Sequence, residues 1–431
     1  MTLALTGFAV LLLLCFFGIR VGFATMMVGI VGFASLRGWD AALSLTGQQI
    51  MDDAMNYNLS VIPLFILMGT FIYRADVSRD LYDAAYAGFG RFRGGLALST
   101  VVACAGFSAV CGSSLATAAT MTKVAMPPMR RYKYSDALAA GSIASSGTLG
   151  IMIPPSVPLV IYAIVAEQDI GKLFIAGVLP GLLLVALFLG AVRFAVWRRP
   201  QDGPAGDASD PQVTRRALRV VWPVLGLFIL VLGGIYGSIF TPTEAAGIGA
   251  FGAMVISLLR GHLRTFDEWI STLAEAARTT ATLFIVIFGA LVFAQFINMS
   301  GMPYDLLDIV DSMKLTPTGL VIAVVLIAIV MGMIFESIGI LLLLVPVFMP
   351  SLHQSGVDLI WFGIVVVLVT ELGLITPPIG MNVFVVKAVM PDIRLANIFA
   401  GVTPFVGAIL IALLLIFLVP GIATFLPAFM R

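Results

Sequence analysis

Charged side chains are scarce in this chain. Only 11% of its 431 residues are Asp, Glu, Lys or Arg, whereas a soluble domain usually carries about 25%. Apolar runs of about 18 residues or more recur along the whole length instead, which predicts a polytopic α-helical membrane protein surrounded by the lipid bilayer. The formal net charge is only +1, so the total charge indicates no acidic partner and we expect no nucleic-acid binding.

Histidine and cysteine are also rare. The two histidines, His262 and His353, fall in predicted loops, and the chain has no HExxH motif, paired Asp or Ser/Lys dyad at helical spacing. The three cysteines, Cys15, Cys104 and Cys111, lie in apolar or small-residue segments without metal-ligand spacing. These absences disfavour an intramembrane enzyme, so we expect no catalytic activity.

Two proline pairs interrupt segments that are otherwise apolar enough to cross a membrane. GTLGIMIPPSVPLVIYAIV (147–165) contains Pro154-Pro155, and ELGLITPP (371–378) contains Pro377-Pro378. A shift of 223 residues superposes the two pairs and also places Ser114 on Ser337. This register predicts an internal duplication.

The predicted duplication divides the chain near its midpoint. The first repeat covers 1–197, the second covers 217–431, and a linker covers 198–216. The linker begins with a stretch rich in Pro, Gly and Asp, which predicts a solvated cytoplasmic loop.

The distribution of Lys and Arg predicts how the repeats cross the membrane. Basic loops flank 94–127 on both sides, whereas loops poor in basic residues flank 316–350 on both sides. Each of these segments must then enter and leave from one face, as a re-entrant hairpin. The other crossings include two proline-broken helices, 136–166 and 358–391, and they alternate when the N-terminus is periplasmic. The predicted fold is an all-α, inverted-topology repeat with about ten transmembrane helices and two re-entrant helical hairpins.

The proline breaks supply groups that bind cations. Because proline has no N–H, carbonyls near 150–154 and 373–377 lose their helical donors. Irregular backbone at membrane depth persists only where it is buried in protein or lines a wet cavity, and broken helices in inverted repeats build ion sites in this way. We therefore interpret these carbonyls as ligands for Na⁺.

The hairpin tips supply polar side chains. The first tip, AVCGSSLATAAT (109–120), combines glycine with several hydroxyls. The second, MGMIFESIGI (331–340), contains Glu336, the only acid between Asp311 and Asp358. An intramembrane carboxylate indicates a functional site, although Glu336 fits equally well as a structural acid bonded to the backbone of the opposite tip. Glu371, beside the second break, is the next candidate carboxylate.

Six segments together resemble one known family of transport proteins. They are GSSLATAAT (112–120), GTLGIMIPPSVPLVIYA (147–163), LFIAGVLPGLLL (173–184), IYGSIFTPTEAAGIGA (235–250), GMIFESIGILLLLVPVFMP (332–350) and ELGLITPPIGMNVFVV (371–386). They extend over nearly the whole chain. Their combination resembles the large membrane subunit, the DctM-like M subunit, of tripartite ATP-independent periplasmic (TRAP) transporters.

The resemblance implies a secondary active transporter of the bacterial inner membrane. It implies Na⁺-coupled uptake of an organic acid, such as a C4-dicarboxylate or sialic acid, by an elevator mechanism, with the amphipathic segments 38–57 and 261–279 as connecting arms. It also implies two partners: a periplasmic substrate-binding protein, and a small four-helix membrane subunit (Q type) on a separate chain.

Carried over residue by residue, the resemblance implies two Na⁺ sites and one substrate site. The first tip and the first break would supply Gly112, Ser113, Ser114, Gly147, Gly150 and Pro154. The second tip and the second break would supply Gly332, Glu336, Ser337, Thr370, Gly373 and Thr376. The substrate would lie between the tips, near Ser145, Thr148, Ser156, Pro378 and Asn382. Its carboxylate is expected to use hairpin N–H groups, because the predicted core has almost no Lys or Arg.

The alternative interpretation within transport is a stand-alone Na⁺/dicarboxylate symporter of similar build that needs no binding protein. Uptake measured with and without a binding protein distinguishes the two. The identity of the substrate does not follow from this sequence.

Overall fold

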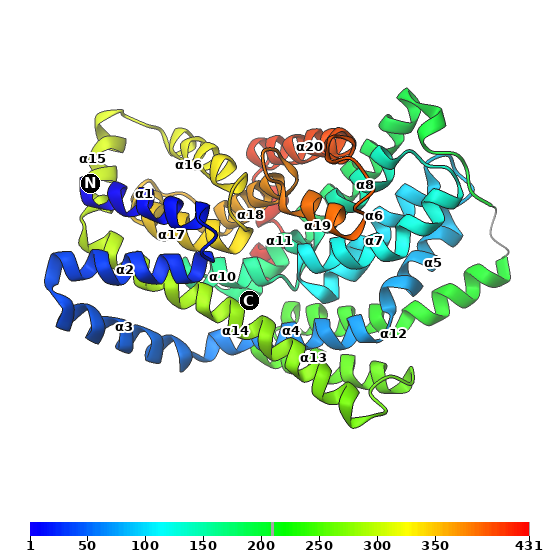
Figure 1. The fold of residues 1–431 in the computed structure, drawn as a ribbon, viewed down its shortest axis with the longest axis horizontal. Helices are drawn as coiled ribbons and strands as arrows, with labels where there is room; N and C mark the ends of the chain where they lie inside the picture. The colour runs from blue at the N-terminus through cyan, green and yellow to red at the C-terminus, as the bar shows by residue number, and fades with distance from the viewer. Residues whose placement is uncertain (208–210, 431) are drawn as a thin grey trace.

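The computed structural model describes residues 1–207 and 211–430, and its regular structure is helical (Figure 1). The first part of the chain forms α1 (Thr2–Phe16), α2 (Val21–Arg37), α3 (Trp39–Ala54), α4 (Val61–Arg74), α5 (Val77–Phe89), α6 (Gly95–Cys111), α7 (Ser114–Arg131), α8 (Asp136–Gly147), α9 (Leu149–Met152), α10 (Val157–Val165) and α11 (Ile170–Arg198). The second part forms α12 (Pro211–Tyr236), α13 (Pro242–Leu259), α14 (Phe266–Met299), α15 (Met302–Ser312), α16 (Pro317–Gly332), α17 (Ser337–Gln354), α18 (Leu359–Ile375), α19 (Met381–Val389), α20 (Leu395–Leu418) and α21 (Gly421–Thr424). The predicted all-α fold class is confirmed.

Polar residues between the apolar segments determine where several helices begin. Ser113, Ser135 and Asp169 each accept a main-chain N–H in the first turn of α7, α8 and α11. Helix α14 begins with a capping box formed by Thr265 and Glu268. These side chains bond N–H groups that have no helical acceptor, which stabilises each helix start.

Seven of the described helices are long and apolar enough to cross a membrane, and the bent pair of α8–α9 with α10 makes an eighth. The chain is therefore a multi-pass membrane protein. Five further apolar helices, α1, α2, α6, α16 and α18, fall in the range of 10–17 residues, whereas a crossing needs about 20. Helix length alone thus supports fewer crossings than the predicted ten.

The two parts of the chain contain the same series of elements. Helices α6 and α7 form a hairpin with its turn at 112–113, and α16 and α17 form one with its turn at 333–336. A helix broken at a proline pair follows each hairpin: α8–α9 bends by 42° into α10, and α18 is interrupted before α19. A long helix comes next, α11 or α20. These elements lie where the sequence predicts them, and their inverted relation stays a prediction.

The outer ends of the first hairpin meet at one end of the molecule. The N–H of Gly94, just before α6, donates to Gly203 O (2.8 Å), and the N–H of Ser135, just after α7, donates to Asp202 O (3.0 Å). One short segment therefore joins the chain on both sides of α6–α7. The predicted re-entrant hairpin requires that its two outer ends lie close together, and its placement in the membrane stays a prediction.

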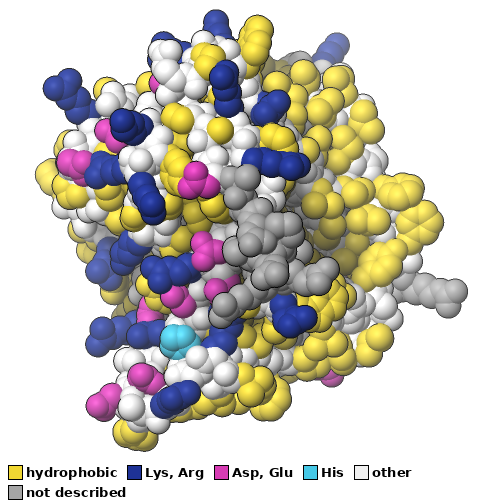
Figure 2. Space-filling model, turned by 90° about the vertical axis from the view of Figure 1, so that its right-hand side faces the viewer, with side chains coloured by type: hydrophobic (Ala, Val, Ile, Leu, Met, Phe, Trp, Pro, Cys, Tyr) yellow, Lys and Arg dark blue, Asp and Glu magenta, His cyan; other side chains and the backbone are white. Residues whose placement is uncertain are grey.

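The predicted basic loops also gather at this end. Arg260, which follows α13, forms an ion pair with Asp80 and donates to Ala75 O (3.0 Å), so one further basic loop joins this group. Figure 2 shows this end of the molecule, with many Lys and Arg side chains on one side of the view and hydrophobic side chains on the other. If the basic loops on both sides of α6–α7, the loop after α11 and the loop after α13 all face the cytoplasm, they must lie together in this way.

Two segments can be described more closely than the sequence allowed. Within the predicted linker, Ala205 pairs with Arg93, Gly203 is buried and α12 begins at Pro211. Part of the predicted linker, 208–210, lies outside the described residues. In addition, the amphipathic segment before residue 280 and the apolar segment after it form one continuous helix, α14, of 34 residues.

Glycines let the two parts of the chain approach closely. A Cβ on Gly401 of α20 would lie 1.8 Å from Ala137 O of α8, so these helices touch through their backbones. Small residues at helix crossings permit this packing in membranes. The broken helix of the first part is thereby fixed against the long helix of the second.

Candidate functional site

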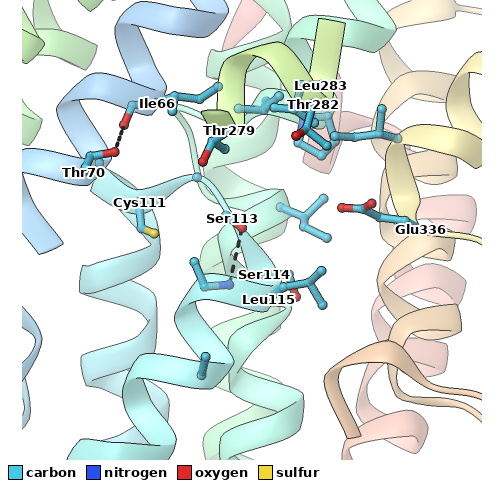
Figure 3. Close-up of a pocket in the computed structure, with 18 of the residues that line it drawn as sticks. Ile66, Thr70, Cys111, Ser113, Ser114, Leu115, Thr279, Thr282, Leu283 and Glu336 are labelled. Atoms are coloured by element: carbon cyan, nitrogen blue, oxygen red, sulfur yellow. Dashed lines mark hydrogen bonds between the residues drawn. The ribbon is translucent and has the colours of Figure 1, made fainter. Parts of the chain in front are cut away.

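A cavity of about 590 Å³ lies between the two hairpin tips and two other helices. The first tip contributes 111–116, the second contributes 336–338, and α4 and α14 complete the wall. Figure 3 shows Glu336, in the turn before α17, pointing toward the first tip, where the Ser113 hydroxyl accepts the N–H of Ala116 at the start of α7. Thr279 and Thr282 of α14 lie on a further side of the cavity. The volume is in the range of sites for small molecules, about 300–1,000 Å³.

The first tip rests on the first proline break. Gly112 ends α6 with φ +62°, a left-handed conformation that favours glycine. A Cβ there would lie 3.3 Å from Pro155 O, and one on Gly150 would lie 3.4 Å from the Ser113 carbonyl carbon. Of the predicted Na⁺ residues of the first break, Gly150 thus lies against the first tip, whereas Gly147 faces Ala118 of α7 and Pro154 lies beside Gly177 of α11.

The second tip is pressed against the second break still more closely. A Cβ on Gly373 would lie 2.5 Å from the Gly332 backbone. Glu336 precedes α17 at its N-cap position, where its side chain does not cap the helix, and it lines the cavity together with the buried Ser337. Thr370 and Thr376 donate their hydroxyls to carbonyls of their own helix, Val367 O (2.8 Å) and Leu372 O (2.5 Å).

Positions 223 residues apart meet at this one cavity. Ser114 and Ser337 both line it, and so do Ile151 and Leu374 of the two breaks. Leu374 O lacks a helical donor because the residue four positions later is Pro378. Corresponding parts of the two halves therefore face each other across the space.

The predicted substrate residues lie elsewhere. Ser145, Thr148, Ser156 and Asn382 are fully buried, and Pro378 is exposed beside the second break. The hydroxyls of Thr148 and Ser156 are bonded to carbonyls within the first broken helix, Ser145 O (2.8 Å) and Ile151 O. In this conformation these hydroxyls hold the broken helix together.

Asn382 joins the two halves. Its Nδ2 donates to Ser114 Oγ (2.7 Å) in the first tip and to Ala144 O (2.9 Å) in α8. The residue 223 positions earlier is Leu159, which has no polar group to make the reciprocal bond. The tether therefore exists for the first tip and not for the second.

Residues 8–422 match the model of the family described as the tripartite ATP-independent periplasmic transporter, DctM component. The chain belongs to this family. It is a TRAP transporter large permease, and the resemblance read from the sequence is confirmed.

Relatives of this permease serve different substrates. The C4-dicarboxylate TRAP transporter large permease protein DctM of Pseudomonas aeruginosa is 36% identical over 88% of each chain. The ectoine TRAP transporter large permease protein TeaC of Halomonas elongata is 32% identical over 99% of each chain. The sialic acid TRAP transporter large permease protein SiaM of Vibrio cholerae is 31% identical over 96% of each chain.

A solved structure supports the fold of the permease. The YdaH transporter of Alcanivorax borkumensis, described as having an unusual topology, superposes with a TM-score of 0.63 over 89% of each chain, at 15% sequence identity. At this level of identity the likeness concerns the fold alone.

The permease also contains a buried carboxylate without a partner. Glu371 is fully buried, and within the described part of the chain neither carboxylate oxygen has a partner at good hydrogen-bond geometry. Since Gly373 faces the second hairpin, Glu371, two positions earlier and about 200° around the helix, points the other way. The Thr148 hydroxyl and the Met152 N–H of the first break lie beside it. An unpaired buried carboxylate is costly unless a cation or a proton accompanies it.

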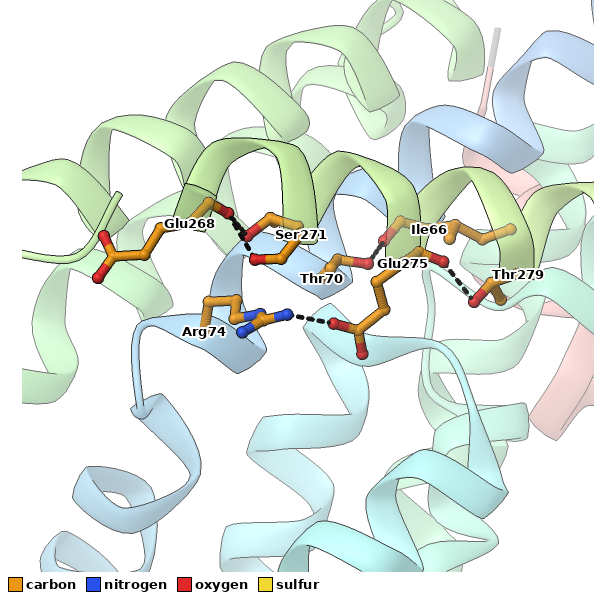
Figure 4. Close-up of polar contacts among 8 residues, drawn as sticks. Ile66, Thr70, Arg74, Glu268, Ser271, Glu275 and Thr279 are labelled. Carbon is orange, nitrogen blue, oxygen red and sulfur yellow. Dashed lines mark hydrogen bonds and ion pairs between the residues drawn. The ribbon is translucent and has the colours of Figure 1, made fainter. Parts of the chain in front are cut away.

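Sequence reasoning missed the wall formed by α4 and α14. From α14 it includes Glu275, Arg278, Thr279 and Thr282. In Figure 4, Glu275 and Thr279 project from α14 beside Arg74 at the end of α4. The spacing of these residues by three or four indicates one face of a helix. This spacing was visible in the sequence, within and just after the segment 261–279 that was interpreted as a connecting arm.

Proposed function

We propose that this permease takes up an organic acid across the bacterial inner membrane together with Na⁺, by an elevator mechanism. The observation that carries this proposal is the cavity in which both hairpin tips and both proline breaks meet. The site combines hydroxyls, carbonyls without helical donors and one carboxylate, which suit Na⁺. We keep the periplasmic N-terminus as part of this proposal.

Sodium is proposed to occupy two sites, one at each contact between a tip and a break. The close approaches of Gly112 to Pro155 O and of Gly332 to Gly373 support these positions. Glu371 fits a cation as well, because its orphaned carboxylate lies between the two breaks. Binding of Na⁺ would stabilise the packing of tips on breaks and so complete the cavity for the substrate.

In an elevator mechanism, the cavity lies between a part of the protein that moves and a part that stays fixed. The hairpins and the broken helices would move together, because glycine contacts and the Asn382 bonds join them. Helices α4 and α14 would form part of the fixed wall. The substrate would then contact the α14 side chains at only one end of the movement.

An organic anion is the favoured substrate class. Arg278 is the one basic residue that lines the cavity within the described part of the chain. Relatives named for C4-dicarboxylate, sialic acid and ectoine transport have carboxylates in common among their substrates. The free N–H groups at the start of α7 and α17 would supply further hydrogen bonds to the anion.

A periplasmic binding protein and a small membrane subunit are the proposed partners. The tripartite family supports this proposal. One relative, the isethionate TRAP transporter permease protein DctMQ of Oleidesulfovibrio alaskensis, is matched over only 58% of its own length, while 86% of this chain is covered. A second membrane part in that relative accords with a separate small subunit here.

Reconstitution tests the proposal. Proteoliposomes that contain the permease and its small subunit should accumulate radiolabelled succinate, sialic acid or ectoine only with an inward Na⁺ gradient and the binding protein. Replacing Na⁺ with K⁺ is the control for the ion. Uptake without a Na⁺ gradient would contradict the coupling, and uptake without the binding protein would favour the stand-alone symporter.

A further inference from the structure

Arg278 stands out among the residues around the cavity. It lies on α14, its side chain is exposed, and it lines the space between the hairpin tips. None of the ion pairs formed by the described residues involves Arg278. Its guanidinium is therefore free to meet a negatively charged group that enters the cavity.

The acidic residue nearest to Arg278 on α14 already forms an ion pair with a different basic residue. Glu275 precedes Arg278 by three residues, a spacing at which a carboxylate and a guanidinium pair readily on a helix surface. Instead, Glu275 Oε2 accepts from Arg74 Nη2 at 2.9 Å, as Figure 4 shows. Arg74 is the last residue of α4, so the pair joins α4 to α14 at the edge of the cavity.

We infer that Arg278 binds a carboxylate of the transported anion, and that Arg74 is a positioning residue that keeps Glu275 from neutralising Arg278. The inference rests on the proposed function, since it concerns the substrate class of the same cavity. It changes the expectation that hairpin N–H groups alone bind the carboxylate.

The way in which guanidinium and carboxylate groups pair favours these two roles for Arg278 and Arg74. A guanidinium offers two parallel N–H donors that match a carboxylate, so Arg is suited to recognise an organic acid. A neighbouring Glu275 that turned to Arg278 would occupy the same donors and repel the substrate's charge. With Arg74 in place, the charges of Glu275 and Arg74 balance each other and Arg278 remains available.

Binding measurements on the purified full chain in lipid nanodiscs test both parts. Succinate, sialic acid and ectoine are titrated in NaCl by calorimetry, with succinamide as an uncharged analogue of succinate. The variants are Arg278→Gln, Arg74→Met, Glu275→Gln and the double variant Arg74→Met/Glu275→Gln. Arg79→Met, which removes an exposed guanidinium from α5, is the matched control.

We expect Arg278→Gln to raise the Kd of the acid by about tenfold or more, because a charge-assisted bond is lost. Succinamide binding should not change. Arg74→Met should weaken acid binding in the same direction by a few-fold, and the added Glu275→Gln substitution should restore it. A merely structural role of Arg74 predicts no such rescue.

Four results would overturn the inference or its second part. Unchanged acid binding in Arg278→Gln would remove Arg278 from the site. A double variant as weak as Arg74→Met would remove the positioning role, as would an equal effect of Arg79→Met. If the wild-type chain binds none of the three acids with Na⁺ present, the inference fails, whereas the proposed function is judged separately by uptake in the presence of the binding protein.

Discussion

The two hairpin tips occupy corresponding positions in the sequence but differ in chemistry and in attachment. Residue 113 is a serine, and its counterpart 223 positions later is Glu336. The first tip is tethered by Asn382, whereas the second is held by the contact of Gly332 with Gly373. The same order of elements thus gives a neutral first tip that is held by hydrogen bonds and an acidic second tip that is held by close backbone packing.

This difference suggests how two parts of a chain with the same series of elements can form unequal sites. The backbone contributes similar breaks to both halves, because each proline pair removes helical N–H donors. The side chains, by contrast, differ between the tips: the second tip carries a charge, and the first is held by a polar tether. We expect the second site to depend more on a single side chain than the first.

The largest expected effect comes from neutralising the acidic tip. Glu336→Gln keeps the size of the side chain but removes its charge, so the Na⁺ concentration for half-maximal uptake should rise by about tenfold or more. Ser114→Ala, at the neutral tip, should raise it by less. Sodium titrations of uptake measure both, and equal titration curves for the two variants and wild type would refute the comparison.

The next effect concerns the glycine contact at the second break. Gly373→Ala would push against the Gly332 backbone, which lies at 2.5 Å, and should cost about 1–3 kcal/mol of stability. Its counterpart Gly150→Ala meets Ser108 and Ser113 at 3.3–3.4 Å and should cost less. Thermal unfolding in nanodiscs compares the pair. A larger loss for Gly150→Ala would reverse the assignment of the tighter contact.

The tether of the first tip gives a third test. Asn382→Leu removes both donors to the first half and should destabilise the permease by about 1–2 kcal/mol. Leu159→Ile, at the corresponding position of the first half, serves as the packing control. Hydrogen exchange should rise at 112–117 and stay constant at 335–340. Equal exchange in the two segments would mean that Asn382 does not hold the first tip.

The smallest effect is expected at the surface. The Arg130 guanidinium, which bonds to Asp392, lowers the pKa of that carboxyl below its ordinary value. A lowered pKa in the folded chain stabilises it above the ordinary pKa of aspartate, and this stabilisation is lost as the pH falls through the lowered value. Asp392→Asn should therefore reduce the pH dependence of thermal unfolding slightly in the acid range. Superimposable pH profiles would show that the pair contributes nothing.

Local chemistry made part of this site predictable. The breaks and the tips could be located from the sequence alone. They depend on proline pairs, glycine turns and a lone acid, Glu336, which determine the structure close to their own positions in the chain. The charge of the loops also predicted which segments meet at one end, as the bonds from Gly94 and Ser135 to 202–203 illustrate.

Contacts between distant segments were not predictable in the same way. The family resemblance implied a place for Asn382 near the substrate, but no local pattern indicated its hydrogen bonds to partners 268 and 238 residues away. Arg278 belongs to the segment 261–279 that was interpreted as a connecting arm, because nothing local indicates that this segment and the next form one helix, α14. Such roles follow from packing, which single-sequence patterns do not encode.

The number of Na⁺ ions bound per chain tests the central claim most directly. Equilibrium binding of radioactive sodium to the purified permease should give two ions for the wild type and one for Glu336→Gln, because only the site at the acidic tip depends on that carboxylate. The same number of ions in both proteins, or none in the wild type, would contradict a pair of sodium sites formed by tips and breaks.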